Sequence, residues 1–210
     1  AFEGCARLRK IVNLSDVELK AETHDRSLKY VCELENKDGK ITKLASCIDR
    51  IITDDGFVID HYYFDQTDEY VLLDYLGKEK NVIVPQGVTE IGFVFSNCDF
   101  IENIVLPDSI RKIYAEGLYG TAFYQNEKNW ENGALYIGNN LIKVKKDVKE
   151  FVLKPGTKVI AISAFEDCYQ LTDLTVSGDY FETFQELSNL ETICLEKLPS
   201  CIRNYFGVVP

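Results

Sequence analysis

Two histidines and seven cysteines are the side chains of this 210-residue chain that are most often used for catalysis. A cysteine thiol beside a histidine can become a nucleophile, because the imidazole takes its proton. Cys47 and His61 are the residues from which such a pair could be drawn. No catalytic motif surrounds either of them, and His24 also stands alone in the sequence. We therefore expect no catalytic residues and no enzyme activity.

Two acidic stretches have some of the features of calcium loops. Asp54-Asp55-Gly56 and Asn36-Lys37-Asp38-Gly39 each place carboxylates next to a glycine. A calcium loop needs alternating acidic ligands followed by a distal glutamate, and neither stretch has that arrangement. Asp, Asn and Gly favour turns for local backbone reasons, so both stretches are predicted to be tight turns. We expect no metal site and no cofactor.

The cysteines divide into two groups. Cys5, Cys98 and Cys168 occupy one position in three copies of a repeat, where a small side chain packs inward. The remaining four show no Cys-x-x-Cys spacing of the metal-binding kind, and they are Cys32, Cys47, Cys194 and Cys201. Cys32 and Cys47 flank a predicted turn, and they face each other only if that turn centres on Gly39-Lys40. The disulfide state of these four residues stays open.

Aromatic and acidic residues are interleaved in one short stretch of the chain. The aromatic members are Phe57, Tyr62, Tyr63, Phe64, Tyr70 and Tyr75, and the acids are Asp60, Asp65, Asp68 and Glu69. Neighbouring strand residues point to opposite faces, so at least one of Tyr62 and Tyr63 should face outward. A tyrosine beside carboxylates suits stacking on a sugar or a hot spot for a protein partner. The alternative is that the cluster packs against the rest of the chain.

An internal repeat organises the segments that must position these residues. In each copy, phenylalanine is followed by cysteine three residues later and by aliphatic residues three and six beyond the cysteine. The copies are Phe2/Cys5/Leu8/Ile11, Phe95/Cys98/Ile101/Ile104 and Phe165/Cys168/Leu171/Leu174. Such self-similarity is the signature of a solenoid, in which each repeat buries its apolar face against the next one. We expect Phe95 and Phe165 to be almost fully buried.

The repeat predicts short strands at a regular spacing. Val82-Ile83-Val84-Pro85 matches Ile104-Val105-Leu106-Pro107 at an offset of 22 residues. Inward aliphatic residues alternate with outward ones, which is a strand period, and the proline ends each strand. One repeat is degenerate, because Gly117-Leu118-Tyr119 stands where its phenylalanine should be. After it, a loop is predicted over 120–133 and a tight hairpin over 135–144. The last repeat is shortened to 19 residues. The expected fold class is a β-rich (α+β) repeat solenoid, a right-handed coil with an inserted β-hairpin segment.

Residues Val159 to Leu174 resemble the BspA-type (treponemal-type) leucine-rich repeat. The pattern of that family is Val-x-x-Ile-Gly-x-x-Ala-Phe-x-x-Cys-x-x-Leu-x-x-Ile-x-Ile-Pro, and Val88 to Pro107 matches it too, with Val94 in place of the alanine. The resemblance covers roughly two thirds of the chain. It implies a curved, β-rich solenoid from secreted or surface-attached bacterial proteins, which often act in adhesion, and it implies no catalytic residues.

Residues 15–75 depart from the repeat pattern. They hold 15 acidic against 7 basic residues, so that −8 of the net charge of −11 lies there. Residues 28–34 and 41–45 are predicted to pair around an Asp-Gly turn, and 57–64 and 70–76 to form a second hairpin. The expected organisation is a partial leucine-rich repeat over 1–14, an inserted β meander over 15–75, and BspA-type repeats, some of them degenerate, over 76–210.

Charge and hydropathy exclude some partners. A net charge of −11 argues against nucleic acid, because binding to phosphates requires a cationic surface. No run of about 18 apolar residues is present, so we expect no membrane span in this fragment. The sequence has no methionine and begins inside a repeat, so we expect that it was trimmed from a longer chain together with any targeting signal.

The function we expect is that of a non-catalytic recognition or adhesion module in a secreted or cell-surface bacterial protein. Its ligand would be a protein or a glycan, such as a component of the host extracellular matrix. The candidate contact residues are Tyr62 and Tyr63 together with outward positions of the stacked strands, namely Arg9, Lys10, Glu102, Asn103, Thr172, Asp173, Glu191 and Thr192. Two alternatives stay open: a passive spacer that displays another domain of a larger surface protein, or an accessory region of a hydrolase.

Overall fold

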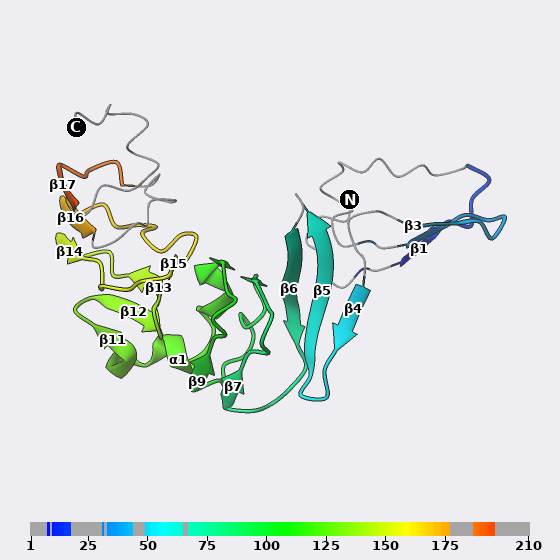
Figure 1. The fold of residues 1–210 in the computed structure, drawn as a ribbon, viewed down its shortest axis with the longest axis horizontal. Helices are drawn as coiled ribbons and strands as arrows, with labels where there is room; N and C mark the ends of the chain where they lie inside the picture. The colour runs from blue at the N-terminus through cyan, green and yellow to red at the C-terminus, as the bar shows by residue number, and fades with distance from the viewer. Residues whose placement is uncertain are drawn as a thin grey trace. The chain divides into compact units, whose positions relative to one another are not determined.

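The computed structural model describes residues 8, 10–17, 31, 33–43, 49–64, 67–176 and 187–195. The chain divides into an N-terminal unit, formed by Ala1–Gly77 with Val88–Glu90, and a repeat unit, formed by Lys78–Gly87 with Ile91–Pro210. Strands dominate both units, and the single α-helix in the described part of the chain has four residues (Figure 1). No helix there is long and apolar enough to cross a membrane.

The first sheet of the N-terminal unit contains β1 (Lys10–Val12), β2 (Glu33–Glu35) and β3 (Ile41–Lys43). β2 and β3 form the predicted antiparallel hairpin, and Gly39 in its turn has a φ of 79° that favours glycine. β1 and β2 pair in parallel, with Lys10 opposite Glu33. The buried Asn13 donates from Nδ2 to Oδ1 of Asn36 at 2.8 Å, so a polar ladder joins the ends of β1 and β2.

The second sheet of the N-terminal unit is built on a long hairpin. β4 (Asp49–Ile52), β5 (Phe57–Phe64) and β6 (Thr67–Tyr75) pair antiparallel in sequence order (Figure 1). The turn predicted at Asp54-Asp55-Gly56 is confirmed, since Gly56 N donates to Thr53 O at 2.9 Å. β6 begins at Thr67 rather than at Tyr70, because the pairing with β5 continues to Phe64 and leaves only residues 65–66 between the strands.

The repeat unit contains the predicted parallel strands. β7 (Asn81–Ile83) pairs with β9 (Asn103–Val105) at the expected offset, with Asn81 opposite Asn103. β14 (Glu150–Val152), β16 (Asp173–Val176) and β17 (Thr192–Leu195) form a second parallel sheet. The pairing of Asp173 with Thr192 confirms the shortened last repeat of 19 residues. The short strands of the repeats are β10 (Lys112–Ile113), β15 (Val159–Ile160) and β8 (Glu90–Ile91), of which Glu90 belongs to the N-terminal unit.

The repeated phenylalanines and cysteines fill the core of the repeat unit, as predicted. The side chains of Phe95 and Phe165 are 0% and 3% exposed. Cys98 and Cys168 are buried beside them, and the thiol of Cys168 lies 3.5 Å from the carbonyl oxygen of Val144. Inward positions of the repeat therefore hold apolar or weakly polar groups, and the fold is a strand-rich solenoid.

The degenerate repeat differs from its prediction as a loop. It contains the 3₁₀ turn η2 (Ala115–Leu118), the helix α1 (Ala122–Gln125), the 3₁₀ turn η3 (Glu127–Asn129) and the strand β11 (Trp130–Glu131). Buried Thr121 caps α1, because its Oγ1 accepts from Tyr124 N at 3.1 Å. At the missing phenylalanine, Gly117 lies so close to the previous repeat that a Cβ would be 2.1 Å from Gly92 O.

The hairpin after β11 confirms the predicted tight turn. β12 (Ala134–Ile137) and β13 (Asn140–Val144) pair antiparallel around Gly138, which has a φ of 60°. β13 also pairs in parallel with β15, so the hairpin continues the stack of repeats. The segment that follows the corner after β9 is therefore a helix and a hairpin instead of another strand alongside β9.

Candidate functional site

The outer face of the β5–β6 hairpin collects aromatic and acidic residues in the N-terminal unit. His61 lies opposite Tyr70, and Tyr63 lies opposite Asp68. Asp49 of β4 lies opposite His61. Directly opposite residues of antiparallel strands share a face, so these five residues form one surface, which we call the hairpin face.

The contacts within the hairpin face order its side chains. The rings of His61 and Tyr70 are stacked, with centroids 4.4 Å apart and an interplanar angle of 4°. His61 Nε2 lies 2.6 Å from Asp68 Oδ1. Tyr63 is 56% exposed next to this group, so a large amphipathic ring stands beside a carboxylate at the surface. The prediction that one of the two adjacent tyrosines faces outward is confirmed for Tyr63.

Tyr62 is not part of this surface, because its side chain is only 8% exposed. Its hydroxyl donates to Oδ2 of the fully buried Asp60 at 3.0 Å. Arg50 holds the same carboxylate through Nε to Oδ1 at 2.5 Å and Nη2 to Oδ2 at 2.8 Å. The hydrogen bond to Asp60 raises the pKa of Arg50. The prediction of Tyr62 as an accessible contact residue is therefore wrong, because its hydroxyl is hydrogen-bonded to the buried carboxylate of Asp60.

Two of the predicted outward residues, Glu102 and Asn103, are exposed but paired along the stack. Lys80 Nζ lies 2.6 Å from Glu102 Oε1, and Asn103 Nδ2 donates to Asn81 Oδ1 at 2.7 Å. Both contacts join residues that are 22 positions apart, which is the repeat offset. Glu102 and Asn103 thus contact equivalent positions of the previous repeat.

The other predicted outward residues behave differently from one another. Glu191 and Thr192 are exposed, whereas Thr172 and Asp173 are half-buried and Thr172 Oγ1 donates to Asp173 Oδ2 at 2.7 Å. Lys10, in the N-terminal unit, lies 2.5 Å from Glu35 Oε2, and this hydrogen bond raises the pKa of Lys10. Arg9 lies outside the described residues. These positions do not form one uniform free surface.

A second aromatic group, in the repeat unit, was not predicted from the sequence. Tyr119 and Tyr124 have ring centroids 4.8 Å apart, and Trp130 meets Tyr124 edge-on at 5.3 Å. Lys143 lies over the ring of Tyr119 and donates to Ser163 O at 2.9 Å. Burial, together with nearby Tyr124 and acidic groups, raises the pKa of Tyr119. These rings pack against one another and against the buried Lys143, so their role is to stabilise the packing of the repeat unit.

The residues considered for catalysis and metal binding are not assembled into such a site in the described part of the chain. His61 contacts Asp68 and Tyr70, while His24 and Cys47 lie outside the described residues, as do Cys32 and Cys201. Cys194 is a free, exposed thiol. Among the described ranges, no three His, Cys, Asp or Glu side chains are grouped as metal ligands would be.

Comparison with known proteins gives one match. A family model described as "BspA type Leucine rich repeat region" matches residues 73–190 and 129–206 in six copies. No curated protein and no solved structure matches the chain.

Proposed function

The chain belongs to the BspA-type leucine-rich repeat family, and on that premise we propose that it is a non-catalytic recognition module of a secreted or cell-surface bacterial protein. In this proposal the repeat unit is the rigid scaffold, and the hairpin face of the N-terminal unit contacts the ligand. Binding residues often lie on segments added to a rigid frame, and residues 49–72 precede the part of the chain that the family model matches.

The observation that carries the proposal is the exposed Tyr63 beside Asp68 and the stacked His61–Tyr70 pair. A tyrosine loses little conformational entropy on binding, and it offers both an apolar ring and a hydroxyl. The ordered His61 and Tyr70 rings next to it provide a preorganised surface, which reduces the free-energy cost of binding. Such a surface fits a sugar ring or a side chain of a protein ligand.

The charge of the hairpin face favours a cationic protein or an uncharged glycan over an acidic ligand. Asp49 and Asp68 are both exposed on this face, and the 15–75 segment carries a net charge of −8. A cationic ligand should bind more weakly as salt rises, because exposed charges are screened. Binding of a neutral glycan should depend little on salt, so the salt dependence distinguishes the two ligands.

A binding screen tests this function. The wild-type chain is screened against a glycan array and a set of extracellular matrix proteins, and each ligand found is tested on Tyr63→Ala. Tyr169→Ala is the matched control, because Tyr169 is also exposed and lies in the repeat unit. We expect Tyr63→Ala to weaken binding and Tyr169→Ala to leave it unchanged. A ligand that binds Tyr63→Ala as well as it binds the wild type would contradict the proposed site.

A passive spacer is the second candidate, and the paired outward residues favour it. Lys80 pairs with Glu102, and Asn81 pairs with Asn103, across neighbouring repeats. The polar groups of this part of the surface therefore already have partners within the chain. A spacer needs a stiff stack of repeats and no ligand. If no glycan or matrix protein binds the folded wild-type chain in the screen, the spacer is favoured over the recognition module.

A further inference from the structure

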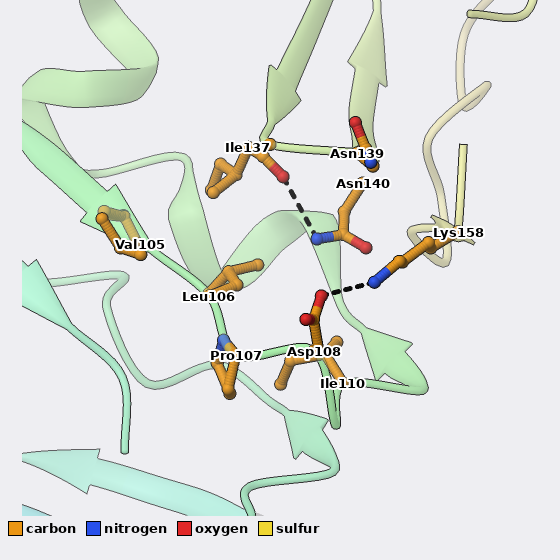
Figure 2. Close-up of a pocket in the computed structure, with 11 residues that line it drawn as sticks. Val105, Leu106, Pro107, Asp108, Ile110, Ile137, Asn139, Asn140 and Lys158 are labelled. Atoms are coloured by element: carbon orange, nitrogen blue, oxygen red, sulfur yellow. Dashed lines mark hydrogen bonds and ion pairs between the residues drawn. The ribbon is translucent and has the colours of Figure 1, made fainter. Parts of the chain in front are cut away.

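The repeat unit contains a hollow whose lining includes no residue of the hairpin face. It has a volume of about 300 Å³ and lies between the corner after β9 and the turn between β12 and β13 (Figure 2). Its lining residues come from these two segments and from one loop: Ile104 to Asp108, Ile110, Ile137 to Asn140, and Lys158. The hollow occurs at the degenerate repeat, where a helix and a hairpin follow in place of a strand alongside β9.

The apolar part of the lining belongs to the core. Ile104, Ile110 and Ile137 are buried aliphatic residues, and Pro107 is buried beside them. Their side chains are fixed by the packing of the repeats, so this side of the hollow is preformed. Val105, which is 55% exposed, and the half-buried Leu106 complete the lining and offer contact to C–H groups of a ligand.

The polar part of the lining contains an amide with unused hydrogen-bonding capacity. Asn140 is only 8% exposed, and its Nδ2 donates to Ile137 O at 3.1 Å. Within the described ranges, no group donates to its Oδ1, which Figure 2 shows turned away from Ile137 toward the side where Asp108 and Lys158 meet. This oxygen is open to solvent, so it takes a donor from water or from a ligand hydroxyl that replaces the water.

A donor and an acceptor of opposite charge stand together at the mouth of the hollow. Lys158 Nζ donates to Asp108 Oδ1, and both side chains are well exposed. The pair carries no net charge, so it does not attract an ion of either sign. A hydroxyl group can accept from the ammonium and donate to the carboxylate at the same time, without leaving either charge uncompensated.

We propose that this hollow binds one neutral sugar ring of a glycan. A sugar ring combines C–H groups for Val105 and Leu106 with hydroxyl groups for Asn140, Asp108 and Lys158. A purely apolar side chain of a peptide would displace that water and leave the Asn140 oxygen without a donor, which costs free energy. The volume is at the lower end of small-molecule sites, which suits a single ring rather than a longer ligand.

This site is independent of the hairpin face, because all its residues belong to the repeat unit. A variant at Tyr63 should therefore leave sugar binding in the hollow intact, and a variant of Asp108 should leave the hairpin face intact. The two proposals can fail separately.

The test is a titration of the ¹⁵N-labelled chain, followed by NMR, with the methyl glycosides of glucose, galactose, mannose and N-acetylglucosamine. We expect at least one of them to shift the backbone amides of Gly138, Asn139 and Asn140 in a saturable way in the millimolar range. Asp108→Ala should weaken that binding by about tenfold, because a charge-assisted hydrogen bond is lost. Asp108 is fully at the surface, so this variant should fold normally.

Lys80→Ala is the matched control, since it removes one member of another exposed ion pair of the same unit. It should leave the sugar affinity unchanged. N-acetyl-leucine methylamide is titrated in parallel as a probe for an apolar peptide side chain. Saturable shifts at these residues with this probe and none with the glycosides would overturn the proposal, as would sugar binding that Asp108→Ala leaves intact.

Discussion

Replacing Phe165 by alanine should lower the free energy of unfolding of the repeat unit by about 3 to 5 kcal/mol. The ring is 3% exposed, so nearly all of its apolar surface is lost from the core. It also meets the ring of Phe151 edge-on, with centroids 5.9 Å apart, and such a pair contributes about 0.5 to 1.5 kcal/mol beyond burial. Since Phe165 and Phe95 occupy the same repeat position, this loss measures how much that inward position contributes to the stability of the solenoid.

Urea denaturation is the suitable assay for Phe165→Ala. Trp130 is the only tryptophan of the chain and lies in the repeat unit, so its fluorescence reports unfolding there. The midpoint should fall while the dependence on urea stays unchanged, which is the signature of a pure stability change. The double variant with Phe151→Ala should show a coupling of about 0.5 to 1.5 kcal/mol.

Phe93→Ala provides the control, because it removes the same atoms from a ring that is 61% exposed. It should cost no more than about 1.5 kcal/mol, the upper value for its contact with Tyr114. A loss below about 1 kcal/mol for Phe165→Ala would refute the assignment of the phenylalanine to the repeated core position.

Three further predictions concern buried and charged groups. Arg50→Ala should cost about 3 to 5 kcal/mol in urea denaturation, because it leaves a buried carboxylate without its cation; a loss below about 1 kcal/mol would contradict that role. Iodoacetamide should label exposed Cys194 in the folded chain and Cys98 only after denaturation, since burial raises the pKa of the Cys98 thiol; mass spectrometry that finds both labelled equally fast would refute the burial. The hydrogen bond from Lys158 lowers the pKa of Asp108, so any stability from this pair is present above the unfolded carboxyl pKa and is lost as pH falls through the folded pKa. Lys158→Ala should return that pKa toward its ordinary range in an NMR pH titration, and an unchanged pKa would contradict the assigned cause.

The repeat architecture could be predicted because equivalent residues recur. Phe95 and Phe165, with the cysteines that follow them, identify the inward positions by their spacing alone, and the offset between β7 and β9 repeats the sequence offset. The parallel pairing of β1 with β2 was missed, because Glu33–Glu35 carries no phenylalanine–cysteine frame. The helix α1 was missed for the related reason that its segment occurs once in the chain and has no second copy for comparison.

The hairpin face could be predicted only in part. Strand alternation requires Tyr62 and Tyr63 to face opposite ways, but it does not say which one is buried. The choice depends on Asp60 and Arg50, whose buried ion pair offers the Tyr62 hydroxyl an acceptor. Such a tertiary contact leaves no periodic signal in the sequence.

The hollow was not predictable from the sequence at all. Asp108, Asn140 and Lys158 come from three segments that no motif connects. Asn140 follows Gly138 and Asn139, which by themselves indicate only a tight turn. Their meeting depends on how the degenerate repeat is accommodated in the stack.

The ratio of the dissociation constants of Tyr63→Ala and the wild-type chain, for a ligand identified in the screen, tests the proposed function most directly. Truncation of a central tyrosine in a binding surface typically costs about 2 kcal/mol or more, so we predict a ratio of about 30 or above. Tyr169→Ala should give a ratio near unity. The urea midpoint of Tyr63→Ala must equal that of the wild type, so that the variant is known to be folded. A ratio below about 2 for that folded variant would contradict recognition through the hairpin face.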